Sequence, residues 1–197
     1  MENILITGGA GFIGSNLSLK LLEKGYNVTV LDILSPQIHG ENAEQNSFLF
    51  LKIRDKVNFI KGSVTSRDDW RKAVYGQDAI IHLAAETGTG QSMYEIEKYT
   101  NVNIGGTAIM LDFLANNDHQ VKKILVASSR SIYGEGKYWS DDVNSFVYPN
   151  HRTDKFMSNG DFEVKYKDFN KPLKLVATDE KSKIHPSSVY GITKQNQ

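Results

Sequence analysis

The sequence predicts an α/β fold in which helices cover both faces of a doubly wound parallel sheet. Short apolar runs of strand length recur up to residue 127, and segments with apolar residues at helical spacing separate them. Strands that are apolar throughout are typical of parallel sheets, which are buried on both faces. The expected strands are Asn3–Thr7, Val28–Leu31, Val57–Ile60, Ala79–Leu83 and Lys123–Ala127, and the expected helices are Phe12–Glu23, Glu41–Lys56, Asp68–Val74, Gln91–Tyr99 and Asn103–Asn116.

The first three elements carry the clearest signals. The strand Asn3–Thr7 is apolar and runs into glycines. In the helix that follows, Ile13, Leu17 and Leu21 recur at helical spacing, and Gly25 is placed to end it. The next strand ends at Asp32.

The segment from Gly136 to Pro186 breaks this alternation. It is rich in Asp, Asn and Lys, and its aromatic residues have no clear period. About fifty residues without strong elements are unusual inside a compact domain, so we expect an insertion or a lid here. We assign residues 1–197 to one partial domain that contains this insertion.

Composition excludes several classes of protein. The 23 basic and 23 acidic residues give zero formal charge, which argues against nucleic-acid and anionic-membrane surfaces. There is no cysteine, so disulfides and thiolate metal sites are excluded, and we expect no metal site. The sequence shows no signal-peptide pattern at its start and no apolar stretch of membrane-spanning length. We therefore expect a soluble, cytoplasmic protein.

A glycine turn follows the first strand. Gly8, Gly11 and Gly14 form a GxxGxxG pattern between strand and helix, where backbone N–H groups and the helix N-terminus can receive a pyrophosphate. Asp32 lies 24 residues beyond Gly8, where a carboxylate binds the adenosine ribose and repels a 2′-phosphate, which favours NAD over NADP. The alternatives are a tight turn that binds nothing and a solvated aspartate at a strand end.

A second pattern, YxxxK, places Tyr190 and Lys194 one helical turn apart. Tyrosine ionises near pKa ~10, and an adjacent ammonium favours the phenolate that a proton-transfer step needs. Ser129 follows the fifth strand, where its hydroxyl can donate to a substrate oxygen. The alternatives are an exposed surface pair, and a Ser128–Ser129 dipeptide that caps the next segment. We interpret His82, inside an apolar strand, as a core histidine.

These motifs, taken in order, resemble those of the extended short-chain dehydrogenase/reductase family of nucleotide-sugar epimerases and dehydratases. The matching segments are TGGAGFIGSNL, HLAAETGTGQS, NIGGT, VASSRSIYGEG and SVYGITK. The resemblance implies a Rossmann-like fold, an NAD cofactor and a catalytic trio of Ser129, Tyr190 and Lys194. It implies cofactor contacts from Gly8, Gly11, Phe12, Ile13, Gly14, Asp32, Ser63, Val64, Leu83, Ala84, Ala85, Thr87, Asn103, Tyr190 and Lys194, with Asn103 matching the family's structural asparagine.

Two departures refine the expected function. Gly62-Ser63-Val64 stands where the family usually has Gly-Asp-Val, so an acidic contact beside the adenine is lost. Arg130 and Ser131 stand where 4,6-dehydratases have an Asp-Glu pair, which disfavours dehydration and leaves C4 epimerisation of a UDP- or dTDP-sugar. Within the family, AAETGTGQSMYE and ASSRSIYGEG are most similar to dTDP-L-rhamnose 4-epimerase-like and UDP-glucose 4-epimerase-like members.

The resemblance also implies a C-terminal substrate domain, most of which would lie beyond Gln197. We expect a chain without it to be weak or inactive, with the last helical turn frayed after Lys194. Its partners would be a nucleotide sugar and either a second copy in a homodimer or a separately encoded C-terminal half. The alternatives are a dinucleotide-binding remnant without turnover and another dehydratase or reductase of the family.

Overall fold

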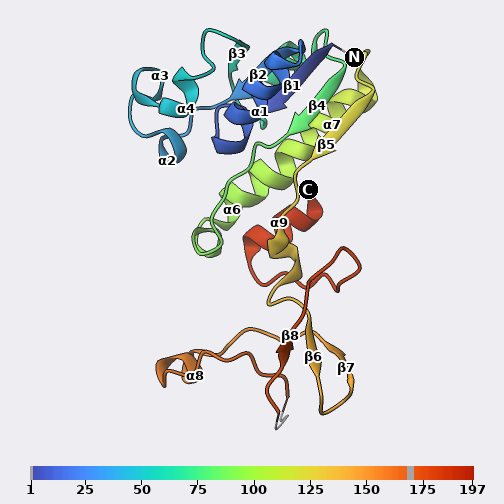
Figure 1. Ribbon diagram of the computed structural model, residues 1–197. Helices are drawn as coiled ribbons and strands as arrows, with labels where there is room; N and C mark the ends of the chain where they lie inside the picture. Colours follow the sequence, from blue (N-terminus) through green and yellow to red (C-terminus); the bar gives the residue numbers. More distant parts are fainter. Residues whose placement is uncertain (1, 168–170) are drawn as a thin grey trace. The chain divides into compact units, whose positions relative to one another are not determined.

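The computed structural model describes residues 2–167 and 171–197 (Figure 1). The chain divides into two compact units. The first comprises Met1–Thr87, Glu95–Ala127 and Gln197, and the second comprises Gly88–Tyr94 and Ser128–Asn196. The sheet lies in the first unit, and the YxxxK helix lies in the second.

The first unit is built on a five-stranded parallel sheet in the order β3-β2-β1-β4-β5. All five predicted strands are confirmed to within one residue at either end. In register, Thr7 of β1 pairs with Leu31 of β2 and with His82 of β4, so the carboxyl ends of these strands meet at one edge. The strand order reverses between β1 and β4, and ligands bind α/β sheets at such a switch point. The strands are β1 (Asn3–Thr7), β2 (Asn27–Asp32), β3 (Asn58–Lys61), β4 (Ala79–His82) and β5 (Lys123–Val126).

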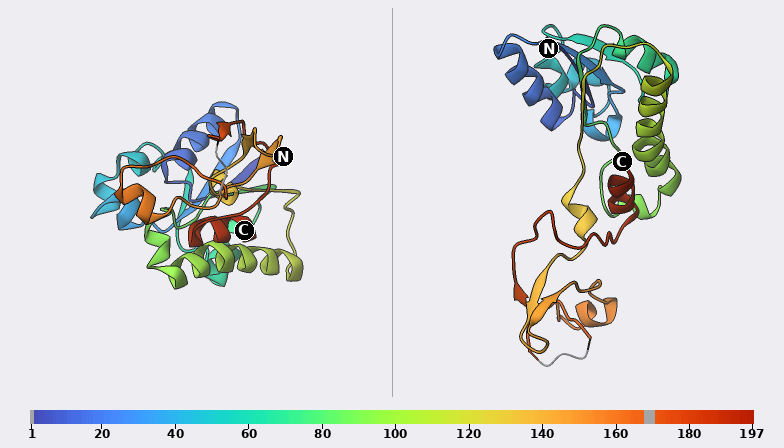
Figure 2. Two further views of the ribbon diagram at one scale, coloured as in Figure 1. Left: turned by 90° about the horizontal axis from the view of Figure 1, so that it is seen from below. Right: turned by 90° about the vertical axis from the view of Figure 1, so that its right-hand side faces the viewer.

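The sheet is covered on both faces because neighbouring β1 residues point to opposite sides. Ile4 and Ile6 join a core cluster that includes Phe50 and against which α1 (Phe12–Glu23) packs. Leu5 joins a second cluster that includes Trp70 of α5 (Arg67–Val74) and Met110 of α7 (Gly106–Asn116). Figures 1 and 2 show α1 and α7 on opposite faces of the sheet. The predicted fold class is therefore confirmed.

Shorter helices follow β2 and β4. The single helix expected over Glu41–Lys56 is instead divided into four-residue helices, because Ser47 caps a new helix by accepting a hydrogen bond from the Phe50 N–H. After β4, the π-helical segment η2 (Thr100–Gly105) joins α6 (Ile96–Tyr99) and α7 into one continuous helix. The other elements are α2 (Pro36–His39), α3 (Ala43–Asn46), α4 (Phe48–Leu51) and η1 (Gln91–Met93).

The second unit contains a small antiparallel sheet in the order β7-β6-β8. The predicted insertion at 136–186 contains this sheet and one short helix joined by turns and irregular segments, and residues 168–170 of it lie outside the described residues. Its strands are two or three residues long, too short to show a period in the sequence. The elements are η3 (Arg130–Tyr133), β6 (Tyr138–Ser140), β7 (Ser145–Val147), α8 (Asp154–Ser158), β8 (Lys174–Leu175) and α9 (Val189–Asn196).

Candidate functional site

The glycine turn packs directly against the backbone that follows β4. Gly8 has φ +67°, and a Cβ built on it would lie 2.7 Å from the Ala84 nitrogen. A Cβ on Gly14 would lie 2.5 Å from the Gly8 carbonyl oxygen. No side chain fits at either position, so the glycines bring the turn, the helix start and the β4 loop into contact.

The N-terminus of α1 is open to an anion. Gly11 occupies the N-cap without a side-chain cap, and the first turn holds no acidic residue. The leading N–H groups of a helix have no intrahelical acceptor and carry a partial positive charge. Because the turn also removes side chains from their approach, the site suits a phosphate group.

Asp32 is buried, with 9% of its surface exposed, which argues against a solvated strand-end aspartate. Its Oδ2 accepts a hydrogen bond from the Ala10 N–H at 3.0 Å, and its Oδ1 accepts one from the Leu34 N–H at 2.8 Å. The carboxylate therefore fixes the glycine turn to the end of β2. A carboxylate has about four acceptor positions, so capacity remains for hydroxyl donors of a ligand.

Behind this carboxylate lies a histidine that sequence analysis missed. The His39 Nε2 lies 3.9 Å from Asp32 Oδ1, and its Nδ1 lies 2.8 Å from the Ser47 hydroxyl. The imidazole is 2% exposed. It lies on a four-residue helix whose sequence has no recognisable period, although His39 follows Asp32 by only seven residues.

Ser63, which replaces the usual aspartate, is engaged locally. Its hydroxyl pairs with the Thr65 hydroxyl at 2.8 Å, and its N–H donates to Asp69 Oδ2 at 3.0 Å. The latter bond is the main cause that lowers the Asp69 pKa. The carbonyl of Val64 accepts a bond from the Trp70 indole at 2.7 Å. Two side chains of α5, Asp69 and Trp70, therefore fix the position of Ser63 and Val64.

The loop after β4 is fixed by side chains from the sheet and from the continuous helix. Asn103, fully buried on η2, accepts from the Glu86 N–H at 2.8 Å and donates to the Glu86 carbonyl at 3.2 Å. The Tyr99 hydroxyl donates to the Thr87 carbonyl at 2.5 Å, and Thr7 Oγ1 accepts from the Ala84 N–H at 3.2 Å. Asn103 acts on the site through this loop and does not itself line the cavity.

His82 is confirmed as a core histidine. It is fully buried, with Nδ1 2.7 Å from Thr7 Oγ1 and Nε2 3.1 Å from Thr107 Oγ1. Since Thr107 donates its own proton to the Asn103 carbonyl, it accepts from His82, which assigns the imidazole proton to Nε2. The His82 imidazole therefore links β1 to α7 through hydrogen bonds.

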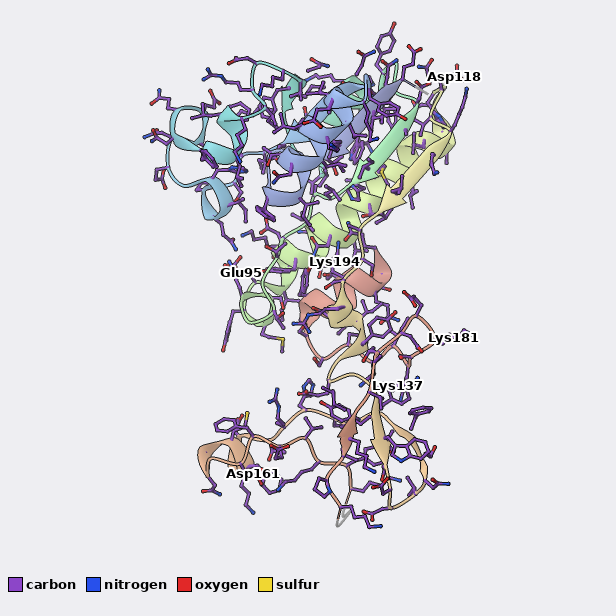
Figure 3. The ribbon with its side chains drawn as sticks, viewed as in Figure 1. Glu95, Asp118, Lys137, Asp161, Lys181 and Lys194 are labelled. Carbon is purple, nitrogen blue, oxygen red and sulfur yellow. The ribbon has the colours of Figure 1, made fainter. Side chains whose placement is uncertain are left out.

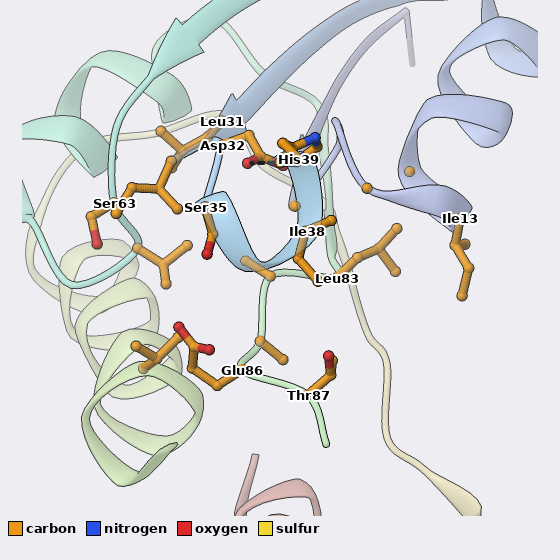
Figure 4. Close-up of a pocket in the computed structure, with 18 of the residues that line it drawn as sticks. Ile13, Leu31, Asp32, Ser35, Ile38, His39, Ser63, Leu83, Glu86 and Thr87 are labelled. Atoms are coloured by element: carbon orange, nitrogen blue, oxygen red, sulfur yellow. Dashed lines mark ion pairs between the residues drawn. The ribbon is translucent and has the colours of Figure 1, made fainter. Parts of the chain in front are cut away.

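These walls enclose a cavity of about 410 Å³ at the carboxyl edge of the sheet (Figure 4). Twelve of the fifteen residues implied as cofactor contacts line it: Gly8, Gly11, Phe12, Ile13, Gly14, Asp32, Ser63, Val64, Leu83, Ala84, Ala85 and Thr87. Sequence analysis missed the other lining residues, which are Leu31, Ile33, Ser35, Ile38, His39, Leu49, Gly62, Glu86 and Val102. An adenosine diphosphate moiety fits these features, because an uncapped helix start, a side-chain-free turn and a carboxylate follow one another along the wall.

The proposed proton-transfer residues belong to the second unit. Tyr190 and Lys194 lie on α9, and Ser129 is the N-cap of η3, where its Oγ accepts from the Ser131 N–H at 3.1 Å. Ser129 therefore caps the following segment, as the alternative interpretation has it, and its hydroxyl points to Ser131 Oγ at 3.2 Å. A hydroxyl that makes weak local bonds can still turn toward a substrate oxygen.

Lys194 is deeply buried on α9 (Figure 3), with 4% of its surface exposed. Burial lowers the pKa of its ammonium to about 8, because the charged form loses hydration. The last turn of α9 is anchored by the Ser128 hydroxyl, which donates to the Lys194 carbonyl at 3.1 Å. The turn that we expected to fray is thus held by a side chain outside the helix.

The fold and the cavity together define a dinucleotide-binding α/β protein. The chain belongs to the NAD dependent epimerase/dehydratase family, whose model matches residues 4–153.

Three similar proteins illustrate the relationship. A dTDP-L-rhamnose 4-epimerase from Burkholderia thailandensis is 35% identical, with 100% of this chain and 52% of that protein covered. UDP-glucose 4-epimerase 3 from Oryza sativa subsp. japonica is 33% identical over 68% of this chain and 36% of its own. The crystal structure of UDP-glucuronic acid 4-epimerase from Bacillus cereus, in complex with UDP-glucuronic acid and NAD, has a TM-score of 0.66 and 25% identity, covering 98% of this chain and 49% of that one. This chain spans about half the length of the first of these relatives.

Two absences hold for residues 2–167 and 171–197, the part of the chain that the structure describes. Within these ranges no helix is both long and apolar enough to cross a membrane. Across the same described residues, no group of three or more His, Cys, Asp or Glu side chains is arranged to hold a metal ion.

Proposed function

We propose that this chain supplies the NAD site and the proton-transfer residues of a nucleotide-sugar 4-epimerase. The observation that carries the proposal is the cavity lined by the glycine turn and Asp32 at the switch point of the sheet. The YxxxK pair on α9 adds the residues for proton transfer. The relatives named above, all 4-epimerases of nucleotide sugars, support the same reaction class.

The chain's own groups have distinct tasks in this reaction. Backbone N–H groups at the start of α1 bind the pyrophosphate, and Asp32 accepts hydrogen bonds from the adenosine ribose hydroxyls. Tyr190, as phenolate, takes the proton of the sugar C4 hydroxyl, and the Lys194 ammonium stabilises that phenolate. Ser129 orients the C4 oxygen by donating a hydrogen bond.

Bound NAD would supply a reversible hydride acceptor. While the cofactor would take up the C4 hydride, Tyr190 would hold the proton removed from the C4 hydroxyl, so that the sugar would be oxidised to its 4-keto form. Tyr190 would return that proton to the same oxygen as the hydride is restored from the opposite face of C4. Because the hydride and the proton both return to the sugar, the full cycle consumes no other oxidant or reductant.

Arg130 and Ser131 favour epimerisation over dehydration. Loss of water across C5–C6 needs an acid and a base beside the sugar, and neither a guanidinium nor a serine hydroxyl supplies a carboxylate pair. An alternative is a dehydratase or reductase of the family that obtains these groups from other positions.

A second candidate is a dinucleotide-binding module without turnover. The specific observation in its favour is that the chain spans 52% of the Burkholderia thailandensis relative. In this proposal the chain alone binds the dinucleotide, and a nucleotide sugar is turned over only where further polypeptide of the same protein, a separate subunit or a second copy in a homodimer completes the site.

One pair of measurements separates these candidates. Calorimetry of the 197-residue chain with NAD tests the cavity, and NMR of UDP- and dTDP-sugars incubated with the chain tests turnover. We expect NAD binding with negligible epimerisation by the isolated chain. Turnover at ~1–10³ s⁻¹, the ordinary enzyme range, would show that no further polypeptide is required. Absence of NAD binding would contradict both proposals.

A further inference from the structure

The N-terminus of α9 is held by two serines of different origin. Ser188, the residue before the helix, accepts a hydrogen bond from the Gly191 N–H at 3.0 Å. Ser92 lies on η1, 98 positions away in sequence, and its Oγ accepts a hydrogen bond from the Tyr190 N–H at 3.0 Å. The first N–H groups of a helix have no intrahelical acceptor, so each serine satisfies one of them.

Ser92 is itself fixed in place. Its side chain is fully buried, and its hydroxyl donates to the Thr89 carbonyl at 2.6 Å. Its backbone N–H donates to the Gly88 carbonyl at 3.2 Å. The following residues, Met93 and Tyr94, are 51% and 90% exposed, and Ser92 is the buried residue of η1. Its hydroxyl is oriented by a donor bond on one side and an acceptor bond on the other.

The remaining contacts of α9 set its position against η3. A Cβ on Gly191 would lie 2.8 Å from the Ser131 carbonyl oxygen, so the helix packs closely on the segment that Ser129 begins. Ser128 holds the Lys194 carbonyl. Within the helix, the Thr193 hydroxyl donates to the Tyr190 carbonyl at 2.9 Å. Of the bonds described between α9 and residues outside it, the one to Ser92 is made by the backbone of Tyr190 itself.

We propose that Ser92 is a positioning residue for Tyr190 in the epimerase reaction. This inference rests on the proposed function. By fixing the N–H of Tyr190, Ser92 sets the distance from the phenol to the oxygen that Ser129 orients. Displacements of about 1 Å at a reacting group can reduce rates by about a hundredfold, so a single backbone bond at this residue has a measurable effect.

The test compares Ser92→Ala and Ser92→Thr with the matched control Ser188→Ala, which removes a serine cap from the same helix end but leaves Tyr190 bonded. In the active protein, full-length or completed by its partner polypeptide, we expect Ser92→Ala to lower kcat about tenfold with KM for the sugar nucleotide unchanged. Ser92→Thr should restore most of the rate. Ser188→Ala should have the same melting temperature as Ser92→Ala. Its decrease in log kcat should be less than about half of the decrease in Ser92→Ala.

A second measurement does not depend on turnover. In the 197-residue chain, hydrogen exchange of the Tyr190 amide should accelerate about tenfold in Ser92→Ala and stay unchanged in Ser188→Ala. Equal rate losses in the two alanine variants, or unchanged Tyr190 exchange in Ser92→Ala, would overturn the inference. A wild-type protein that binds NAD but turns over no sugar would instead contradict the proposed function, and the exchange measurement would still decide the role of Ser92.

Discussion

At the residue scale, Asp32 combines a predicted ribose contact with a structural role that the sequence did not indicate. Its position 24 residues after Gly8 predicted a ribose ligand, but its bonds to the Ala10 and Leu34 N–H groups follow from the folded turn alone. An alanine at this position would remove the ribose contact and release the glycine turn together. An asparagine removes the charge and keeps a carbonyl oxygen for one backbone donor, but its NH2 group cannot accept from the other.

Asp32→Asn should therefore weaken the preference for NAD over NADP. We expect the unmodified chain to bind NAD at least about tenfold more tightly, because a 2′-phosphate would face a buried carboxylate. Calorimetry with both dinucleotides should show this ratio falling toward one in Asp32→Asn. The control Asp55→Asn changes a carboxylate that is 77% exposed and should leave the ratio unchanged. Equal affinities in the unmodified chain would contradict the assignment of Asp32.

Gly8 and Gly25 form a matched pair for testing the turn. Both have positive φ, but a Cβ on Gly8 would meet the Ala84 backbone, whereas one on Gly25 would meet nothing within 4 Å. Gly25→Ala should lose about 1–2 kcal/mol of unfolding free energy from backbone strain alone. Gly8→Ala should lose more than that and also lose NAD binding. Urea denaturation and calorimetry measure the two effects, and equal losses of stability would show that the contact with Ala84 is unimportant.

At the scale of secondary-structure elements, α9 combines an anchored helix with a buried charge. Lys194 is 4% exposed and its pKa is about 8 instead of 10.5. A depressed lysine pKa means that the folded state binds this proton more weakly than the unfolded state does. The resulting destabilisation is complete below pH 8, decreases as pH rises, and vanishes above about 10.5.

Lys194→Met should accordingly raise the unfolding free energy in the absence of dinucleotide. The expected gain at pH 7 is about 1–3 kcal/mol, since the shift from 10.5 to about 8 sets an upper value near 3 kcal/mol. Denaturation between pH 7 and 11 should show the gain shrinking as pH rises. Lys20→Met, at a side chain that is 65% exposed, serves as control and should show no such trend. A loss of stability in Lys194→Met at pH 7 would mean that burial does not set this pKa.

Elements differ in how far the sequence predicts them, for physical reasons. β1, β2 and β4 were predictable because strands buried on both faces are continuously apolar, and the edge strands β3 and β5 carry apolar residues although they are less buried. The four-residue helices α2 to α4 and the strands β6 to β8 are shorter than any period can show. For the same reason the cavity wall from Ile33 to Leu49, including His39, was missed. Gly8, Asp32 and Thr87 were recognised because they belong to a short motif or to a segment that resembles the family. Their roles in binding the cofactor stay predictions.

At the scale of the whole molecule, β5 is an edge strand with an apolar surface. Ile124, Leu125 and Val126 are 37%, 48% and 39% exposed, and among the described residues only β4 pairs with β5. Unpaired backbone groups beside apolar side chains form a template for pairing with another chain. We therefore expect the 197-residue chain to self-associate at micromolar concentrations.

Leu125→Lys should reduce that association without altering NAD binding. A charge at the centre of an edge strand opposes pairing with a second copy. Sedimentation velocity over a concentration series measures the association, with Leu111→Lys, on an exposed position of α7, as control for added charge. Association that persists in Leu125→Lys would place the interface on another surface.

The reaction type is the prediction that concerns the complete protein. With any missing polypeptide supplied, it should interconvert C4 epimers of a nucleotide sugar without loss of water, because Arg130 and Ser131 provide no carboxylate pair. NMR of the sugar ring protons follows both outcomes in one sample. Accumulation of a 4-keto-6-deoxy sugar would contradict this expectation.

The strand order has a consequence for synthesis of the chain. Ile4 of β1 pairs with Ala79 of β4, so the centre of the sheet joins segments that leave the ribosome 75 residues apart. At translation rates of about 5–20 residues per second, that interval lasts roughly 4–15 s. During it the apolar β1 can pair with β2 but has no partner on its other side. Nascent chains are therefore exposed to chaperones and proteases until β4 emerges, and the backbone against which Gly8 packs arrives with it.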